Sequence, residues 1–129
     1  RPRPNYFHYC GYDKSKHTCT GPEKYKKDAK VSFPSGHASI SFCTATWLML
    51  FLQQFYNFSG EIWYLLIKFS PIVVAIFISA TRITDYMHHV SDVVAGSVLG
   101  IGIGSTIFNS QASRIRIQLK RSYDPLAQL

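Results

Sequence analysis

Charged side chains are scarce in this chain of 129 residues, and acidic side chains are the scarcest. Lysine and arginine together number 14 and aspartate and glutamate only 7, so charged residues make up 16% of the sequence while apolar residues make up 47%. This disfavours a soluble domain, in which about a quarter of the residues are usually charged. The length excludes more than one domain of ordinary size. The chain also lacks an initiating methionine and a signal peptide, and we expect it to be a piece of a longer protein.

The lack of charge is concentrated in three long stretches. Residues 38–56 and 93–113 contain no charged side chain, and residues 62–81 contain only Lys68, near one end. Each stretch has about the length that a helix needs to cross the hydrocarbon core of a bilayer. A lysine near a helix end can extend to the interface, and a membrane helix tolerates Pro71. A buried helix of a soluble core is the alternative for any single stretch, but three in a row favour membrane spans.

The predicted fold is therefore all-α, a multi-span helical membrane protein. Its three transmembrane helices are expected over residues 38–56, 62–82 and 89–111. The third carries glycines four residues apart, at positions Gly96, Gly100 and Gly104. Glycines at this spacing share one face of a helix, where small side chains allow another helix to approach closely. We expect that face to lie in a helix–helix interface.

Three spans divide the polar segments between the two sides of the membrane. Residues 1–37 and the link 82–92 fall on one side, and the link 57–61 and the tail 112–129 on the other. Six candidate catalytic groups from distant positions then share a side: Arg3, Ser35, His37, Arg82, His88 and Asp92. Ionisable residues at the edge of a membrane are candidates for a functional site.

The charge of these segments leaves the orientation open. The tail contains four basic residues, Arg114, Arg116, Lys120 and Arg121, which suits the cytoplasmic side. The N-terminal segment contains more: Arg1, Arg3, Lys14, Lys16, Lys24, Lys26, Lys27 and Lys30. Counted alone, these would make that segment cytoplasmic, but basic side chains could instead serve an anionic substrate.

The three cysteines are of two kinds. Cys10 and Cys19 lie nine positions apart in the polar N-terminal segment, where they either form a disulfide in an oxidising compartment or remain free thiols. Cys43 lies within an apolar stretch and is expected to be a small buried side chain.

The stretch "TRITDYMHHVSD", residues 81–92, combines residues suited to phosphate chemistry. His88 is four positions before Asp92, so on a helix the two would share a face and the carboxylate could orient the imidazole for attack. His89 could also reach Asp92, and the spacing does not choose between the two histidines. Arg82 offers a planar fork of donors for phosphate oxygens. Asp85 is expected to be a solvated residue of the link.

A second stretch, "SFPSGHASIS", residues 32–41, supplies complementary groups. Pro34 and Ser35 precede a helix start, where free backbone N–H groups favour an anion. Gly36 lets the backbone approach a ligand closely, and a protonated His37 could donate a proton to a leaving oxygen. Each of these features alone is more often an ordinary helix cap.

Together these residues resemble the motifs of the type 2 phosphatidic acid phosphatase superfamily. "PSGH" at 34–37 resembles the second motif, and Arg82, His88 and Asp92 resemble the third. "RPRPNYF" is similar to the end of the first motif, whose lysine would fall before Arg1. "SFPSGHAS" and "DYMHHVSDVVAG" are similar to the eukaryotic lipid phosphate phosphatase branch. The resemblance covers residues 1–108 and departs at Thr81, where the family usually has serine.

The resemblance implies a role for each matching residue. His88, rather than His89, would be the nucleophile that forms a phosphohistidine, Asp92 would orient it, and His37 would be the general acid. The phosphate cradle would consist of Arg3, Ser35, the Gly36 backbone N–H, Thr81 and Arg82. The family is metal-independent, so we expect no metal and no cofactor.

The resemblance also implies an architecture. The chain would be the last three of six spans, with residues 1–36 as a basic active-site loop on the luminal or extracellular side. Residues 37–111 would be the transmembrane part and 112–129 a cytoplasmic tail. This orientation favours a Cys10–Cys19 disulfide, and it leaves the glycosylation pattern at Asn57 on the cytoplasmic side and unmodified. The expected partners are a lipid phosphate and a membrane, without nucleic acid; the oligomeric state is open.

Three other functions are compatible with parts of this pattern. Soluble vanadium haloperoxidases belong to the same superfamily, but the apolar stretches argue against one. An inactive membrane scaffold or transporter would keep the fold, but such relatives tend to lose the groups matched by His37, His88 and Asp92. A membrane phosphatase for soluble phosphate esters is the third alternative, and the sequence does not rank the possible lipid phosphates.

Overall fold

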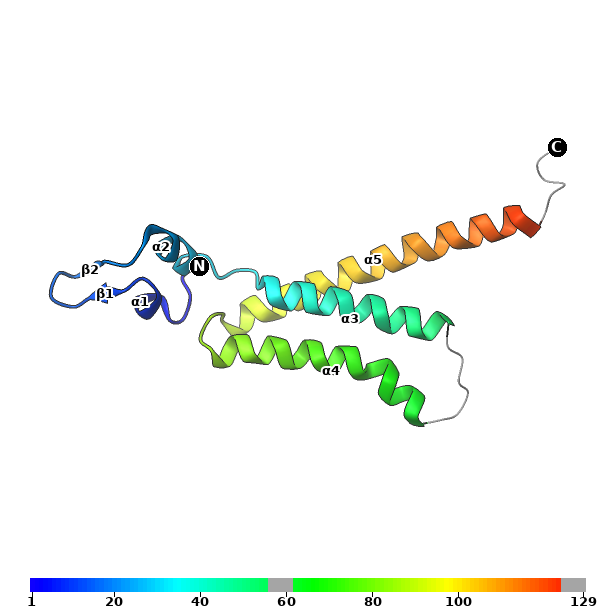
Figure 1. Cartoon of the computed structure of the whole chain (residues 1–129), viewed down its shortest axis with the longest axis horizontal. Helices are drawn as coiled ribbons and strands as arrows, with labels where there is room; N and C mark the ends of the chain where they lie inside the picture. Colours follow the sequence, from blue (N-terminus) through cyan, green and yellow to red (C-terminus); the bar gives the residue numbers. More distant parts are fainter. Residues whose placement is uncertain (56–61, 124–129) are drawn as a thin grey trace.

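The computed structural model describes residues 1–55 and 62–123 and is mostly helical. Its body consists of three long helices, α3 (Gly36–Phe55), α4 (Ile62–Thr84) and α5 (Val90–Tyr123) (Figure 1). The N-terminal residues form small elements at one end: α1 (Tyr6–Tyr9), β1 (Tyr12–Asp13), β2 (Thr18–Cys19) and α2 (Glu23–Ala29). The link 57–61, with its glycosylation pattern, lies outside the described residues.

Three helix boundaries illustrate how the structure differs from the sequence prediction. α5 begins at Val90 rather than at residue 89, so His89 precedes the helix as His88 does, and α4 ends at Thr84 rather than at residue 82. α5 also continues to Tyr123, so most of the predicted tail is helical, because its polar and basic residues do not interrupt a helix.

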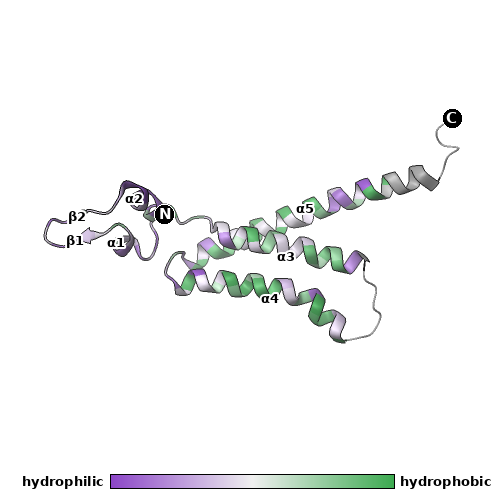
Figure 2. Ribbon diagram, viewed as in Figure 1, coloured by the Kyte–Doolittle hydropathy of each residue, from purple (hydrophilic) through white to green (hydrophobic). Residues whose placement is uncertain are grey.

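α3 lies between the other two long helices. It packs against both α4 and α5, which make few contacts with each other (Figure 1). Among the described residues, two helical segments are long and apolar enough to cross a membrane, Ile62–Thr84 and Val90–Ile115. Figure 2 shows the contrast: α4 is strongly hydrophobic, whereas α3 mixes apolar and polar positions. α3 is covered on two sides by the neighbouring helices α4 and α5.

The glycines of α5 lie against the backbone of α3, as predicted. A Cβ atom added at Gly96 would overlap the Ser35 carbonyl oxygen, and one at Gly104 would lie 2.5 Å from the Cys43 carbonyl oxygen. A Cβ atom at Gly100 would overlap the Ser39 carbonyl oxygen and lie 2.9 Å from the Cys43 nitrogen. The two helices therefore touch backbone to backbone, with no room for a side chain between them.

We predict that Gly100→Leu strongly destabilises the protein. The new side chain would collide with the backbone of α3, which cannot move aside as a flexible side chain could, and overpacking of this kind costs about 1–3 kcal/mol or more. The measurement is the thermal unfolding midpoint of the intact protein in detergent. Gly102→Leu is the matched control, because a Cβ there meets nothing within 4 Å. Equal midpoints for the two variants would contradict the interface.

Residues 1–5 lie between two other segments of the chain and are tied to both. The Arg3 N–H donates to the Ala29 carbonyl at 2.9 Å, and the Ser32 N–H donates to the Arg1 carbonyl at 3.0 Å. On the other side, the Asn5 N–H donates to the Tyr86 carbonyl at 3.2 Å. This pairing fixes the backbone on both sides of Arg3 although it belongs to no helix or strand.

The structure contains the disulfide that the sequence left open. Cys10 and Cys19 are joined, with their Cα atoms 5.3 Å apart, and Cys10 is fully buried. The bridge lies at the base of the β1–β2 hairpin, where the Gly21 N–H also donates to the Cys10 carbonyl at 3.0 Å. Cys43 is half-buried rather than buried as expected, because the helix–helix contact at this point is made by its backbone and not by its side chain.

Candidate active site

A pocket of about 430 Å³ lies where the N-terminal residues meet the ends of α3 and α4. Its walls consist of Arg3, Tyr9, Val31, Ser32, Pro34, Gly36, His37, Arg82, Met87 and His88. Five of the predicted site residues line it: Arg3, Gly36, His37, Arg82 and His88. They come from three segments that are far apart in the sequence, which confirms the expected convergence of the motifs in space.

His88 is buried, and its ring is held by one hydrogen bond. The Nδ1 atom lies 2.8 Å from the Ser32 carbonyl oxygen. A carbonyl oxygen can only accept, so Nδ1 carries the hydrogen and the lone pair of the neutral ring is on Nε2. His88 therefore lines the pocket in the tautomer that leaves Nε2 free to act as a nucleophile.

The partner of His88 differs from the sequence expectation. His88 precedes the first residue of α5, so the helical spacing that would bring it to Asp92 does not apply. The fully buried Asp92 carboxylate instead accepts hydrogen bonds from the Ser32 hydroxyl at 2.7 Å and from the His89 backbone N–H at 3.0 Å. The second bond is half of a capping box at the start of α5. Asp92 thus contacts His88 only indirectly, through the residue whose carbonyl holds the imidazole.

Arg1 adds a further contact to this buried carboxylate. Its guanidinium lies 3.4 Å from Asp92 and donates to the Ser91 hydroxyl at 2.6 Å. Neither Arg1 nor Ser32 was predicted as a site residue. Ser32 lies within the "SFPSGHAS" stretch, but it acts partly through its backbone carbonyl, which leaves no signal in a sequence.

Burial lowers the pKa of His88, because the charged imidazolium loses solvation, and the positive charge of Arg3 acts in the same direction. The hydrogen bond to the Ser32 carbonyl opposes this shift but does not reverse it. His88 is therefore neutral at pH 7 and keeps its lone pair at a pH where an ordinary histidine begins to protonate.

We predict that the imidazole of His88 titrates below the ordinary histidine value of about 6.5 in the substrate-free protein. A lowered pKa means that the neutral ring persists as the pH falls through 6.5 and is lost only at more acidic pH. The measurement is an NMR pH titration of labelled histidine rings in detergent, with the signal assigned by its disappearance in His88→Ala. A midpoint at or above 6.5 would contradict the burial described here.

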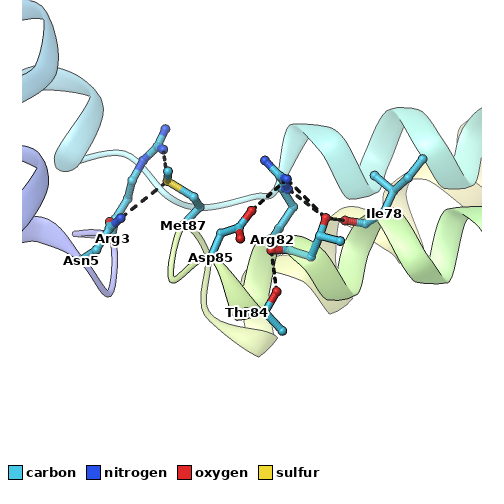
Figure 3. A network of polar contacts seen from close by, with 8 residues as sticks. Arg3, Asn5, Ile78, Arg82, Thr84, Asp85 and Met87 are labelled. Atoms are coloured by element: carbon cyan, nitrogen blue, oxygen red, sulfur yellow. Dashed lines mark hydrogen bonds and ion pairs between the residues drawn. The ribbon is translucent and has the colours of Figure 1, made fainter.

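The two pocket arginines have partners of different strength (Figure 3). Arg3 contacts the Met87 sulfur at 3.4 Å and lies 5.2 Å from the centre of the Tyr9 ring. A thioether and an aromatic face are weak partners, which an anion can readily replace. Arg82 forms an ion pair with Asp85 at 3.0 Å, so Asp85 is not simply the solvated link residue that the sequence suggested.

Three predicted cradle residues lie at or behind the pocket wall. Gly36 lines the pocket, and nothing lies within 4 Å of a Cβ added there. Ser35 is fully buried, and its hydroxyl accepts the Ala38 N–H at 3.4 Å, which caps α3. The Thr81 hydroxyl donates to the Ile78 carbonyl at 2.7 Å and accepts from Arg82 at 3.3 Å. The side chains of Ser35 and Thr81 are therefore not in the pocket lining.

His37, the remaining predicted residue of the lining, is exposed in the first turn of α3. In the described part of the chain, no three His, Cys, Asp or Glu side chains are grouped as a metal site requires. The positive groups that the pocket offers to an anion are Arg3 and Arg82, together with the start of α3.

Two of the long helices are apolar and of membrane length, and the pocket at one end contains two arginines and a buried neutral histidine. This arrangement suits a membrane-associated protein that binds an anionic group. The comparison with known families agrees with this description. The chain belongs to the PAP2 superfamily, whose sequence profile matches residues 1–116.

Curated relatives from several eukaryotes are similar to this chain. It is 37% identical over 116 residues to "Probable lipid phosphate phosphatase 4" of Arabidopsis thaliana, covering 81% of this chain and 38% of the relative. It is 34% identical over 110 residues to "Lipid phosphate phosphatase 1" of the same plant, covering 78% and 34%. It is 30% identical over 122 residues to "Probable diacylglycerol pyrophosphate phosphatase 1" of Schizosaccharomyces pombe, covering 84% and 43%.

These relatives confirm the resemblance to the lipid phosphate phosphatase branch. The chain spans only about two-fifths of their length or less. No solved structure matches the chain.

Proposed function

We propose that this protein hydrolyses lipid phosphate monoesters such as phosphatidic acid through a phosphohistidine intermediate and without a metal ion. The observation that carries the proposal is the environment of His88. Its Nδ1–H donates to the Ser32 carbonyl, so the lone pair of the ring is on Nε2. His88 lines the same pocket as Arg3 and Arg82. The names of the relatives support a phosphate ester of a lipid as the substrate.

The first step follows from these positions. The phosphate is bound by Arg3 and Arg82, which replace their contacts with Met87 and Asp85 by contacts with phosphate oxygens. Nε2 of His88 attacks phosphorus as the bond from phosphorus to the alcohol oxygen breaks. His37, in its protonated form, gives a proton to the leaving oxygen, so that a neutral alcohol departs. The guanidinium groups offset the charge on the transferring phosphoryl group.

The second step returns the enzyme to its starting state. His37, now neutral, takes a proton from water, whose oxygen attacks phosphorus and breaks the bond to His88. Asp92 supports both steps from behind the pocket by holding Ser32, whose carbonyl fixes the tautomer of His88. Ser35 and Thr81 support the start of α3 and the side chain of Arg82.

In the membrane, we propose three spans in this chain out of six in the intact protein, with α3 crossing between α4 and α5. The pocket lies at the same end of all three helices as the N-terminal segment, on the luminal or extracellular side. The Cys10–Cys19 disulfide supports that orientation, since disulfides persist in oxidising compartments. Residues 112–129 would then extend into the cytoplasm.

The test is the release of phosphate from phosphatidic acid in detergent micelles by the purified intact protein, with a chelator present. Release in the chelator, together with acid-labile phosphate on the protein after rapid quenching, is the expected result. Activity that requires an added divalent cation would contradict the metal-independent mechanism. Bromide oxidation in the presence of vanadate would instead identify a haloperoxidase.

A further inference from the structure

A second hollow lies between α3 and α4, within the apolar part of the molecule. It is a groove of about 510 Å³ lined from α3 by Ser41, Thr44, Ala45 and Leu48. From α4 it is lined by Ser70, Pro71, Val74, Ala75 and Ile78. No charged side chain contributes to the lining, so the groove suits an apolar occupant.

The groove exists because the two faces of α3 are packed differently. Against α5, glycines bring the backbones together and leave no space. Against α4, small side chains face each other without glycines, among them the buried Ala45 and Ala75. α4 also contains Pro71, and Figure 1 shows the N-terminal part of this helix turning away from α3. Proline is an ordinary cause of such a bend.

The groove begins one helical turn below the phosphate pocket. On α3, Ser41 follows His37 by four residues, and on α4, Ile78 precedes Arg82 by four residues. Residues four apart lie on the same face of a helix. From Ser41 to Leu48 the groove follows α3 for about 10 Å, at 1.5 Å per residue. A molecule with its phosphate between Arg82 and His37 would therefore have this groove directly beneath it.

We propose that the groove holds the first part of an acyl chain of the lipid phosphate whose headgroup occupies the pocket. The inference rests on the proposed function, because it requires a phosphate joined to an apolar chain. The chain would run from the pocket along α3 and reach the bilayer through the side on which α4 bends away. Because a bilayer is as apolar as the groove, the groove mainly orients a lipid whose tail is already out of water.

Substitutions at Val74 and Val73 distinguish an effect on the groove from a general effect on α4. Both side chains are exposed, 56% and 62%, but only Val74 lines the groove. Val74→Trp would fill the groove from its open side without overpacking the core, and Val73→Trp places the same bulk next to it, outside the groove. Thr44→Phe, also at an exposed position, would fill the groove from the opposite wall.

The experiment compares dioctanoyl phosphatidic acid with an aryl phosphate that has no acyl chain, using the intact protein in detergent. Both groove variants should lose at least about tenfold in kcat/KM for the lipid while hydrolysing the aryl phosphate within about twofold of wild type; Val73→Trp should retain both activities. Equal losses on both substrates would show a structural role. Unchanged activity on both would show that something else, such as another helix of the intact protein, covers the groove. Either result overturns the inference.

A photoreactive acyl chain tests occupancy independently of turnover. A phosphatidic acid analogue with a diazirine in mid-chain should label residues around Leu48 and Val74, even in His88→Ala, and orthovanadate should compete with it for the pocket. Labelling confined to other helices would overturn the inference whether or not the protein is active. Hydrolysis of neither ester by wild type, by contrast, would overturn the proposed function itself.

Discussion

Replacing His88 with alanine is expected to abolish hydrolysis of every phosphate ester by the intact protein. The loss should be at least about ten-thousand-fold, because no other group lining the pocket offers a neutral imidazole nitrogen held by a backbone carbonyl. The covalent phosphate should vanish together with turnover. The measurements are phosphate release and the trapping of acid-labile phosphate after rapid quenching.

His89 is the matched control for this substitution. It is adjacent in the sequence, but its Nε2 lies 3.1 Å from the Pro2 carbonyl oxygen and it does not line the pocket. His89→Ala should therefore keep the phosphoenzyme and lose much less activity. If His89→Ala abolished trapping while His88→Ala retained it, the assignment of the nucleophile would be wrong.

Replacing His37 with alanine is expected to give a loss that depends on the leaving group. For an alkyl ester such as phosphatidic acid, the leaving alkoxide would depart without a proton, and the loss should be about a hundred- to ten-thousand-fold. For an aryl phosphate, whose leaving group is stable without a proton, the rate of the first step should decrease much less. The measurement is the pre-steady-state rate of phosphoenzyme formation with each ester.

The comparison of two esters separates this role from simple damage to the pocket. A misfolded or obstructed pocket would slow both esters alike, because both must bind the same two arginines. Equal losses for alkyl and aryl esters would therefore contradict a proton donor at position 37. The wild-type rates with both esters provide the reference.

Much of the helical framework could be predicted from the sequence because it follows from composition. Stretches without charge identified the positions of α3, α4 and α5, and the spacing of Gly96, Gly100 and Gly104 identified the face of α5 that meets α3. The extension of α5 to Tyr123 was missed, because loss of apolar character marks the end of a membrane segment but not of a helix. The groove beside α3 was missed because the sequence shows Pro71 within α4 but not the direction in which the helix bends there.

The site was predictable where sequence motifs mark its residues and not where an unmarked backbone carbonyl contributes. Arg3, Gly36, His37, Arg82 and His88 were found through motifs, and all line one pocket. The predicted direct hydrogen bond between His88 and Asp92 is replaced by a link through Ser32, because helical spacing was applied to a pair whose first residue precedes the helix. Ser32 links Asp92 to His88 through its backbone carbonyl. Because every residue has such a carbonyl, the sequence does not mark this role.

The disulfide at the base of the β1–β2 hairpin has a consequence for proteolysis. The tip of the hairpin, between Tyr12 and Thr18, is mostly exposed and contains Lys14 and Lys16, so trypsin has access to it. A cut there would leave Arg3 on one fragment and His88 on the other. The bond between Cys10 and Cys19 would still join the fragments, and the backbone pairing on both sides of Arg3 lies outside the cut. A nicked molecule should therefore keep its pocket intact and separate into two pieces only after denaturation in the presence of a reductant.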